Sequence, residues 1–198
     1  MTMPDFAVVV LIGVSGSGQS TFARRHFIPS GILSSNAFQT FVSDDKNDQS
    51  ATEDAFDALH YLTSVRLHWR KSVVIDATNV QPGARKPLLD HAARYDCLVV
   101  AIVLDVPESI CHARNRDRAD RQLGPHVIAN QSQQLRQSLR GLLESVRQAV
   151  ASAGLWEELK TDWLCLDCER MPSEKSWKRT GRDLYRGLQR QHDGLRPF

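Results

Sequence analysis

The stretch GVSGSGQS, residues Gly13 to Ser20, directly follows the apolar run Ala7 to Ile12 and precedes a segment with helical character. It matches the phosphate-loop pattern G-x-x-x-x-G-K-[ST] at every fixed position except the lysine, which is Gln19. In that pattern backbone N–H groups surround phosphates, the lysine reaches the β- and γ-phosphates, and the hydroxyl holds Mg²⁺. The sequence therefore predicts a phosphate loop that has lost its cation.

The order of strand, loop and helix supports this interpretation, because a helix N-terminus offers unpaired N–H groups to an anion. Glycines also let the backbone curl close to the anion. The competing interpretation is a Gly/Ser-rich turn that binds nothing. The combination of glycines, hydroxyl pair and flanking elements favours a phosphate loop, present or ancestral. The residues that we expect to bind nucleotide are Gly13, Ser15, Gly16, Ser17, Gly18, Ser20 and Thr21, with Ser20 as the candidate metal ligand for Mg²⁺.

Bulk composition is typical of one globular domain, since 198 residues with 41% hydrophobic content can bury a single sizeable core. The 25 Lys and Arg residues nearly balance the 23 Asp and Glu residues, so net charge does not argue for nucleic-acid binding. The N-terminal apolar run lacks a basic region and is too short to cross a bilayer. We therefore expect a cytoplasmic protein with no membrane partner. Cys165 and Cys168 have C-x-x-C spacing without a second pair, which does not predict a zinc site.

Apolar runs alternate with amphipathic segments, which predicts an α/β fold with a parallel sheet of about five strands and helices on both faces. The expected strands are Phe6 to Ile12, Lys71 to Asn79 and Cys97 to Pro107, with weaker candidates at 31–35 and 162–167. The expected helices begin at Ser20 and cover Thr52 to Arg70, Pro82 to Tyr95, and roughly His126 to Ala153. We expect one domain over residues 1–170, followed by a basic helix or linker over 171–198.

Two further segments carry candidate functional groups. The run VVIDATNV ends a strand at Asp76, at the sheet edge where ligands bind in open α/β folds. A turn that caps the next helix explains the same residues equally well. The segment RNRDRADRQ places four arginines, Arg114, Arg116, Arg118 and Arg121, between two expected helices. Such a run is usually a solvated face, although arginines beside a phosphate loop also clamp a transferring phosphoryl group.

Taken in order, the motifs GVSGSGQSTFA, SSNAFQ, SDDKNDQ, FDALHY, DATN, ARKPL and RNRDRADRQ resemble the kinase module of the bacterial polynucleotide 5'-kinase/phosphatase of RNA repair. The resemblance covers roughly Val8 to Leu142. It implies a P-loop kinase fold with an arginine-bearing lid. It also implies transfer of the γ-phosphate of ATP or GTP, with Mg²⁺, to the 5'-OH of RNA or DNA, and a phosphatase or ligase partner. The last residues, HDGLRPF, resemble the start of the phosphatase module, which implies a fragment or a chain without that neighbour.

The resemblance assigns roles residue by residue. Ser20 matches the Mg²⁺-binding hydroxyl, and Arg114 and Arg121 match the lid arginines that hold nucleotide phosphate. The family's catalytic positions, in contrast, have lost their charge. They are Gln19 at the phosphate-loop lysine, Asn36 at the aspartate that acts as general base, and Gln39 at an arginine that engages the acceptor phosphate.

These changes predict weak catalysis. Glutamine brings no positive charge to the transition state, and asparagine cannot accept the hydroxyl proton. Losing an electrostatic donor costs about 10²–10³ in rate and losing a general base about 10²–10⁴. A kinase turning over at about 1–100 s⁻¹ would fall to about 10⁻² s⁻¹ at most if the losses multiplied. The favoured interpretation is a degenerate kinase that binds nucleotide or nucleic-acid ends.

The alternative is an active kinase with rearranged catalytic residues or another acceptor. The neighbours that could compensate are Arg24, Arg25, Asp44, Asp45 and Lys46. The family itself carries the acidic pair, so the two aspartates are no obvious replacement for Asn36.

Overall fold

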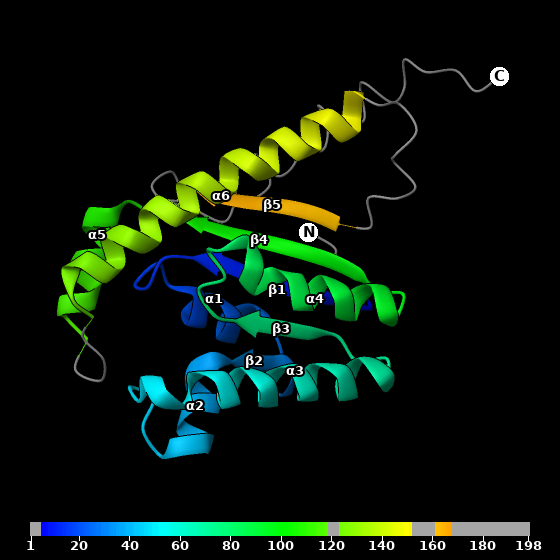
Figure 1. Ribbon diagram of the computed structural model, residues 1–198, viewed down its shortest axis with the longest axis horizontal. Coiled ribbons are helices and arrows are strands. Elements are labelled where there is room, and N and C mark those ends of the chain that lie inside the picture. Colours follow the sequence, from blue (N-terminus) through cyan, green and yellow to red (C-terminus); the bar gives the residue numbers. More distant parts are fainter. Residues whose placement is uncertain (1–4, 119–122, 152–160, 168–198) are drawn as a thin grey trace.

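The computed structural model describes residues 5–118, 123–151 and 161–167, which form one parallel sheet with its surrounding helices (Figure 1). The strands are β1 (Ala7–Gly13), β2 (Ile32–Ser34), β3 (Val73–Asp76), β4 (Leu98–Asp105) and β5 (Thr161–Asp167). The helices are α1 (Gln19–His26), α2 (Ser35–Ser43), α3 (Thr52–His68), α4 (Pro82–Arg94), α5 (Glu108–Arg116) and α6 (Pro125–Ala151). Short 3-10 turns cover Pro29–Gly31 and Gln49–Ala51.

The sheet has the strand order β2-β3-β1-β4-β5, and every neighbouring pair is parallel. In the register, Val8 of β1 lies opposite Val73 of β3 on one side and Val99 of β4 on the other. The chain leaves β1 from the middle of the sheet, so the loop that follows opens between β3 and β4. This is the kind of position where open α/β sheets bind ligands. The five predicted strands are confirmed.

Burial on both faces explains why the central strands are almost entirely apolar. All seven residues of β1 are buried, as are all four residues of β3. Figure 1 shows α3 and α4 in front of the sheet and α1 behind it, with α6 running along the end that carries β4 and β5. The predicted helices after the loop, after Thr52, after Pro82 and after Pro125 are present, which confirms the predicted α/β architecture. No helix in the described ranges is long and apolar enough to cross a membrane.

Two helices were not predicted, and one prediction was wrong. The missed helices are α2 and α5, each of nine residues. The arginine segment was expected between helices, but Arg114 and Arg116 lie in the last turn of α5, and Arg118 follows the C-cap residue Asp117. Cationic side chains are favoured at this end of a helix because its carbonyl groups carry partial negative charge. The basic tail 171–198 and its boundary with the preceding domain lie outside the described residues.

Candidate phosphate-binding site

The loop between β1 and α1 has a backbone that only glycine adopts easily. Gly16 has a φ of 89° and Gly18, at the N-cap of α1, has a φ of 98°. A Cβ on Gly16 would lie 2.6 Å from the carbonyl oxygen of Cys111 in α5, so the loop packs directly against that helix. The loop therefore has a fixed, tightly curved shape that turns its N–H groups toward the start of α1.

The glutamine at the lysine position is directed into the protein. Gln19 is buried, and its Nε2 donates a hydrogen bond of 2.7 Å to the carbonyl oxygen of Ala77, just beyond β3. A neutral amide placed there adds no charge to the loop. The loop therefore keeps the backbone of a phosphate site while its customary cation is replaced by a structural hydrogen bond.

Asp76, at the end of β3, is the centre of a polar cluster beneath the loop. Its carboxylate accepts hydrogen bonds from the hydroxyls of Ser20 in α1 and Ser34 in β2. Burial raises the pKa of the Asp76 carboxyl, whereas these hydrogen bonds and the positive charges of Arg24 and Arg118 act in the opposite direction. A serine hydroxyl beside a buried aspartate at a strand end is the oxygen pair that holds Mg²⁺ in P-loop proteins.

The DATN turn links β3 to the loop rather than capping a helix. Asn79 donates from Nδ2 to the carbonyl oxygen of Leu11 at 2.8 Å, and the Gly13 N–H donates to Thr78 O at 3.0 Å. The N-cap position of α4 is Gln81, which makes no side-chain capping bond. The turn therefore fixes the start of the phosphate loop relative to Asp76, and the helix-cap interpretation is not supported.

Two loop serines behave differently. The Ser15 N–H donates to Oε1 of Gln131 in α6 at 2.9 Å. The Ser17 hydroxyl is buried and has no hydrogen-bond partner among the described residues. A buried hydroxyl without a partner costs free energy, so Ser17 Oγ marks a place where a polar ligand would be favourable. Thr21, on the next turn of α1, is exposed.

Arg114 is the cation that contacts the loop. Its Nη1 donates to the carbonyl oxygens of Gly16 and Ser17 at 3.3 and 3.2 Å, and a Cβ on Gly18 would lie 3.7 Å from the same nitrogen. Arg121 lies outside the described residues. Asn115 holds the two sides of this segment together, since its amide exchanges hydrogen bonds with the backbone of Leu123 at 2.9 and 3.1 Å.

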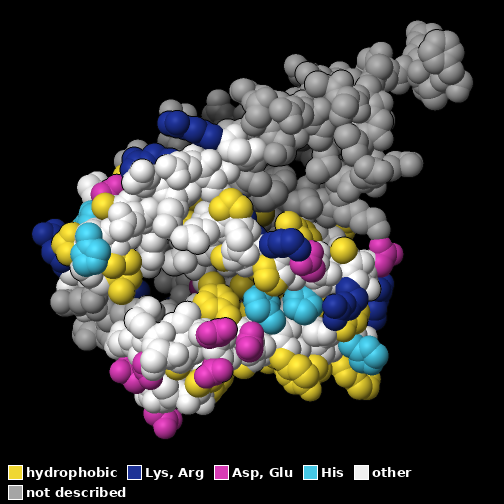
Figure 2. All heavy atoms as spheres, viewed as in Figure 1, with side chains coloured by type: hydrophobic (Ala, Val, Ile, Leu, Met, Phe, Trp, Pro, Cys, Tyr) yellow, Lys and Arg dark blue, Asp and Glu magenta, His cyan; other side chains and the backbone are white. Residues whose placement is uncertain are grey.

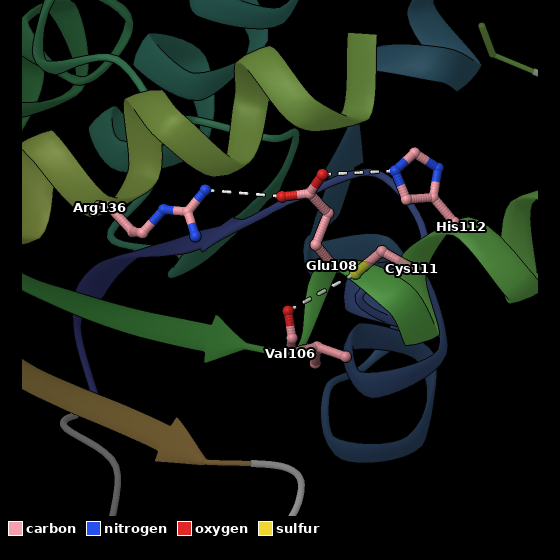
Figure 3. A network of polar contacts seen from close by, with 5 residues as sticks. All are labelled: Val106, Glu108, Cys111, His112 and Arg136. Atoms are coloured by element: carbon pink, nitrogen blue, oxygen red, sulfur yellow. Dashed lines mark hydrogen bonds and ion pairs between the residues drawn. The ribbon is translucent and has the colours of Figure 1, made fainter. Parts of the chain in front are cut away.

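The helix α5 that positions Arg114 is tied to α6 by a second polar group. Figure 3 shows the Glu108 carboxylate between His112 Nε2 and Arg136 Nη2, each 3.5 Å away. The same view shows the Cys111 thiol, which donates to the carbonyl oxygen of Val106 at 3.7 Å. These contacts fix the helix against which Gly16 packs.

The two remaining family positions lie on α2, away from the loop backbone. Asn36 is partly buried near the helix start, and its carbonyl oxygen accepts from Thr40 Oγ1 at 3.0 Å. Gln39 is buried, and its Nε2 donates to Thr52 Oγ1 at 3.1 Å. Gln39 thus joins the helices α2 and α3, a structural role that needs no charge.

Carboxylates dominate the surface beyond these two positions. Figure 2 shows acidic side chains gathered over the part of the molecule that contains α2 and α3. The exposed acidic residues of this region are Asp44, Asp45, Glu53, Asp54 and Asp57. No group of three or more metal-ligating His, Cys, Asp or Glu side chains occurs within the described ranges.

The sequence analysis missed Asp76 as a firm site residue and did not consider Ser34 or Gln131. A buried strand ending in aspartate was visible in VVID, but its serine partners come from β2 and α1, and only the fold brings them together. Gln131 lies 116 residues from Ser15, and nothing in its sequence context marked it.

Comparisons with known proteins agree with this geometry. A family model described as "AAA domain" matches residues 8–149, and one described as "PNKP adenylyltransferase domain, ligase domain" matches residues 128–190. No curated protein matches the chain.

Solved structures share the fold. A chain of the Pnkp1/Rnl/Hen1 RNA repair complex aligns with a TM-score of 0.61 and 21% identity over 71% of this chain. This chain spans 47% of that one, about half its length. A gluconokinase from Sinorhizobium meliloti aligns with a TM-score of 0.50 and 18% identity over 98% of this chain and 97% of that one. Kti12 from Chaetomium thermophilum, in complex with ADP-AlF3, gives 0.56 and 13% over 91% and 98%. The likeness predicted from the motifs is therefore confirmed at the level of the fold, and the chain belongs to the AAA domain family with the architecture of P-loop kinases.

Proposed function

We propose that this protein is a degenerate polynucleotide kinase-like P-loop protein, which holds nucleotide phosphate but transfers the phosphoryl group to a 5'-OH end poorly. The observation that carries the proposal is the hydrogen bond from Gln19 Nε2 to Ala77 O at 2.7 Å. The residue at the lysine position is neutral and engaged with the protein, whereas the surrounding loop keeps its shape.

The residues present fit nucleotide phosphate and Mg²⁺. Ser17 offers a buried hydroxyl without a partner among the described residues, and the Ser20–Asp76 pair offers oxygen ligands suited to Mg²⁺. Bound Mg²⁺ would neutralise charge on the phosphates. The loop N–H groups of residues 15–18 would orient them, and Arg114 would add positive charge from α5.

Catalysis by this chain is expected to be weak for two reasons. Gln19 stabilises the developing charge of the transition state far less than an ammonium group would. Asn36 lacks a carboxylate that could take the proton from an attacking hydroxyl. Both groups act on the same step, so their losses reinforce each other.

The acceptor side also disfavours a nucleic-acid end. Gln39 replaces a cation with an amide that is bound to Thr52. The exposed carboxylates of α2 and α3 lie nearby in sequence, with Asp44 at the C-cap of α2 and Glu53 in the first turn of α3. Phosphates of RNA or DNA would be repelled there, because nucleic-acid affinity depends on cationic side chains.

An active kinase remains the second candidate, and one observation favours it. Arg114 contacts two loop carbonyl groups, so a guanidinium does stand beside the phosphate loop. Arg24 and Arg118 also lie close enough to Asp76 to lower its pKa, against the effect of burial. In this alternative, arginines supply the charge that Gln19 lacks, and the acceptor differs from a 5'-OH end.

We extend the proposal to partners and organisation. Residues 1–170 would form the kinase-like module, located in the cytoplasm, and residues 171–198 would connect it to another protein. The match of residues 128–190 to a ligase-domain description supports a ligase as that partner. One structure of similar fold is part of an RNA repair complex, which is consistent with this assignment.

The test combines calorimetry with a transfer assay. The protein is titrated with ATP and Mg²⁺, then incubated with labelled ATP and a 5'-OH oligonucleotide. We expect binding of ATP and no more than a trace of labelled 5'-phosphate. Transfer at about 1 s⁻¹ or faster would be kinase-like and would contradict the proposal.

A restored variant and a matched control sharpen the result. The double change Gln19→Lys with Asn36→Asp should raise transfer by about 10²-fold or more, because it returns a cation and a base. Gln137→Lys with Asn47→Asp makes the same chemical changes at exposed positions and should have no effect. If the restored variant is also unchanged, the chain performs a different chemistry.

A further inference from the structure

The phosphate loop of the ligand-free protein is already occupied at one N–H group. The Ser15 N–H, which in a phosphate loop faces the anion, donates instead to Gln131 Oε1 at 2.9 Å. The two residues are 116 positions apart, and Gln131 comes from α6, an element that does not belong to the loop. A side-chain carbonyl therefore takes the place of a phosphate oxygen.

The helix α6 is held in place without the help of this bond. Ile128 and Leu135 of α6 are buried in the core, three residues before and four residues after Gln131. On a helix, side chains at these spacings share one face, so Gln131 is on the inner face. Its position on that face brings it to the loop.

Two polar contacts on the next turns reinforce the placement. Arg136 of α6 lies 3.5 Å from the Glu108 carboxylate of α5, as Figure 3 shows. Ser138 of α6 accepts from Arg85 Nη2 of α4 at 2.6 Å. Because α4 and α5 both position α6, the Gln131 side chain reaches the loop whether or not a ligand is present.

The bond has the properties of an exchangeable contact. Gln131 is only partly buried, so water and ligands can compete for the Ser15 N–H. A phosphate oxygen is a stronger acceptor than a neutral amide, since hydrogen bonds to charged groups are about twice as strong. Phosphate can therefore displace Gln131, but it must do so before it occupies the loop fully.

We propose that Gln131 is a gate on the phosphate loop, which competes with bound phosphate for the Ser15 N–H and lowers the affinity of the site. The proposal rests on the proposed function, because it requires a loop that can hold phosphate. It assigns to α6 a regulatory contact that is independent of the Gln19, Asn36 and Gln39 changes.

The test measures binding of inorganic tripolyphosphate by calorimetry to the full chain and three variants. Gln131→Ala removes the competitor and should tighten binding by about two- to tenfold, which is the effect of one neutral hydrogen bond. Gln131→Glu supplies a stronger, charged acceptor that also repels phosphate, and should weaken binding. Gln133→Ala is the matched control, since Gln133 is exposed on the same helix.

The outcomes separate the gate from the proposed function. Tighter binding by Gln131→Ala and weaker binding by Gln131→Glu support the gate. Equal or weaker binding by Gln131→Ala, with the wild type still binding, overturns the gate alone. If neither the wild type nor Gln131→Ala binds tripolyphosphate, both proposals fail.

Hydrogen exchange provides a readout that needs no ligand. The Ser15 amide should exchange more slowly in the wild type than in Gln131→Ala, while Gln133→Ala matches the wild type. Equal exchange in all three proteins would overturn the gate. If Gln131→Ala does not fold, Gln131→Glu decides through the direction of its change in tripolyphosphate affinity.

Discussion

Nη2 of Arg85 in α4 lies 2.6 Å from Oγ of Ser138 in α6, and both side chains are buried. The same guanidinium donates from Nη1 to the carbonyl oxygens of Asn79 and Val80 at 2.6 and 3.2 Å. One buried cation therefore connects the helix that carries the gate residue to the turn that supports the phosphate loop. Burial lowers the pKa of this arginine, which reflects the cost of placing its charge inside the protein.

Arg85→Met should destabilise the fold strongly, because it leaves backbone carbonyl groups without their donor while preserving side-chain volume. We expect a loss of about 2–4 kcal/mol in the free energy of unfolding, measured by urea denaturation. Lys86→Ala is the neighbouring control. It removes an exposed ion pair with Asp90 and should cost less than about 1 kcal/mol. Similar values for both variants would contradict the connecting role of Arg85.

Asp76→Asn tests the Mg²⁺ site through the pH dependence of stability. The pKa of Asp76 is raised in the folded protein, so its ionised form is disfavoured by folding. Wild-type stability from this group is therefore greatest at low pH and falls as pH rises from about 3.8 through the folded pKa. Asp76→Asn cannot ionise, so its stability relative to wild type should increase across that window. Urea denaturation between acidic and neutral pH measures the difference.

The same variant should lose its response to Mg²⁺. At neutral pH, Mg²⁺ at ten times its Kd would stabilise the wild type by about 1.4 kcal/mol, and Asp76→Asn by nothing measurable. Asp54→Asn removes an exposed carboxylate and should keep the wild-type response. An equal response in Asp76→Asn would place Mg²⁺ elsewhere.

Ser17→Ala should separate stability from ligand binding. The hydroxyl is buried without a partner in the described part of the chain, so removing it should stabilise the ligand-free protein by about 1 kcal/mol. Binding of tripolyphosphate should weaken by about two- to tenfold, because a donor to phosphate is lost. Thermal unfolding with and without tripolyphosphate measures both effects. Lower stability without ligand would show that Ser17 has a structural partner.

Gly16→Ala should destabilise the protein, because alanine is strained at a φ of 89° and its Cβ would lie 2.6 Å from Cys111 O. We expect a loss of about 1–3 kcal/mol by urea denaturation. Gly141→Ala provides the contrast, since nothing lies within 4 Å of its added Cβ on α6. It should stabilise by about 0.5–1 kcal/mol, as is usual inside a helix. Equal effects would contradict the close contact between loop and α5.

Long apolar runs made the sheet predictable, whereas α2 and α5 were not. β1 and β4 are continuous buried strands, and such runs are readable without knowledge of their neighbours. Each missed helix has only nine residues, and neither has a side-chain cap hydrogen bond. In α5 the polar and charged residues outnumber the apolar ones, so the segment resembled a loop. Tertiary packing, such as that of buried Cys111, stabilises it instead.

The candidate site was predictable only where its residues are contiguous. Gly13 to Ser20 could be assigned from the pattern of the loop alone. The partners of Asp76 and of the Ser15 N–H come from distant segments, so their roles depend on strand order and helix placement. The hydrogen bonds of Gln19 and Gln39 were likewise invisible, although their loss of charge was evident.

The contact between Gly16 and Cys111 O also bears on how the loop persists during evolution. Any larger residue at position 16 would push the loop away from α5 and damage the core around Cys111. Selection for folding alone would thus preserve this glycine, even in a lineage that had stopped using nucleotides. Gln19 experiences no such constraint toward lysine, since its amide satisfies Ala77 O. The glycine is therefore a record of packing, and a history of phosphate chemistry is better sought in Ser17, Ser20 and Asp76.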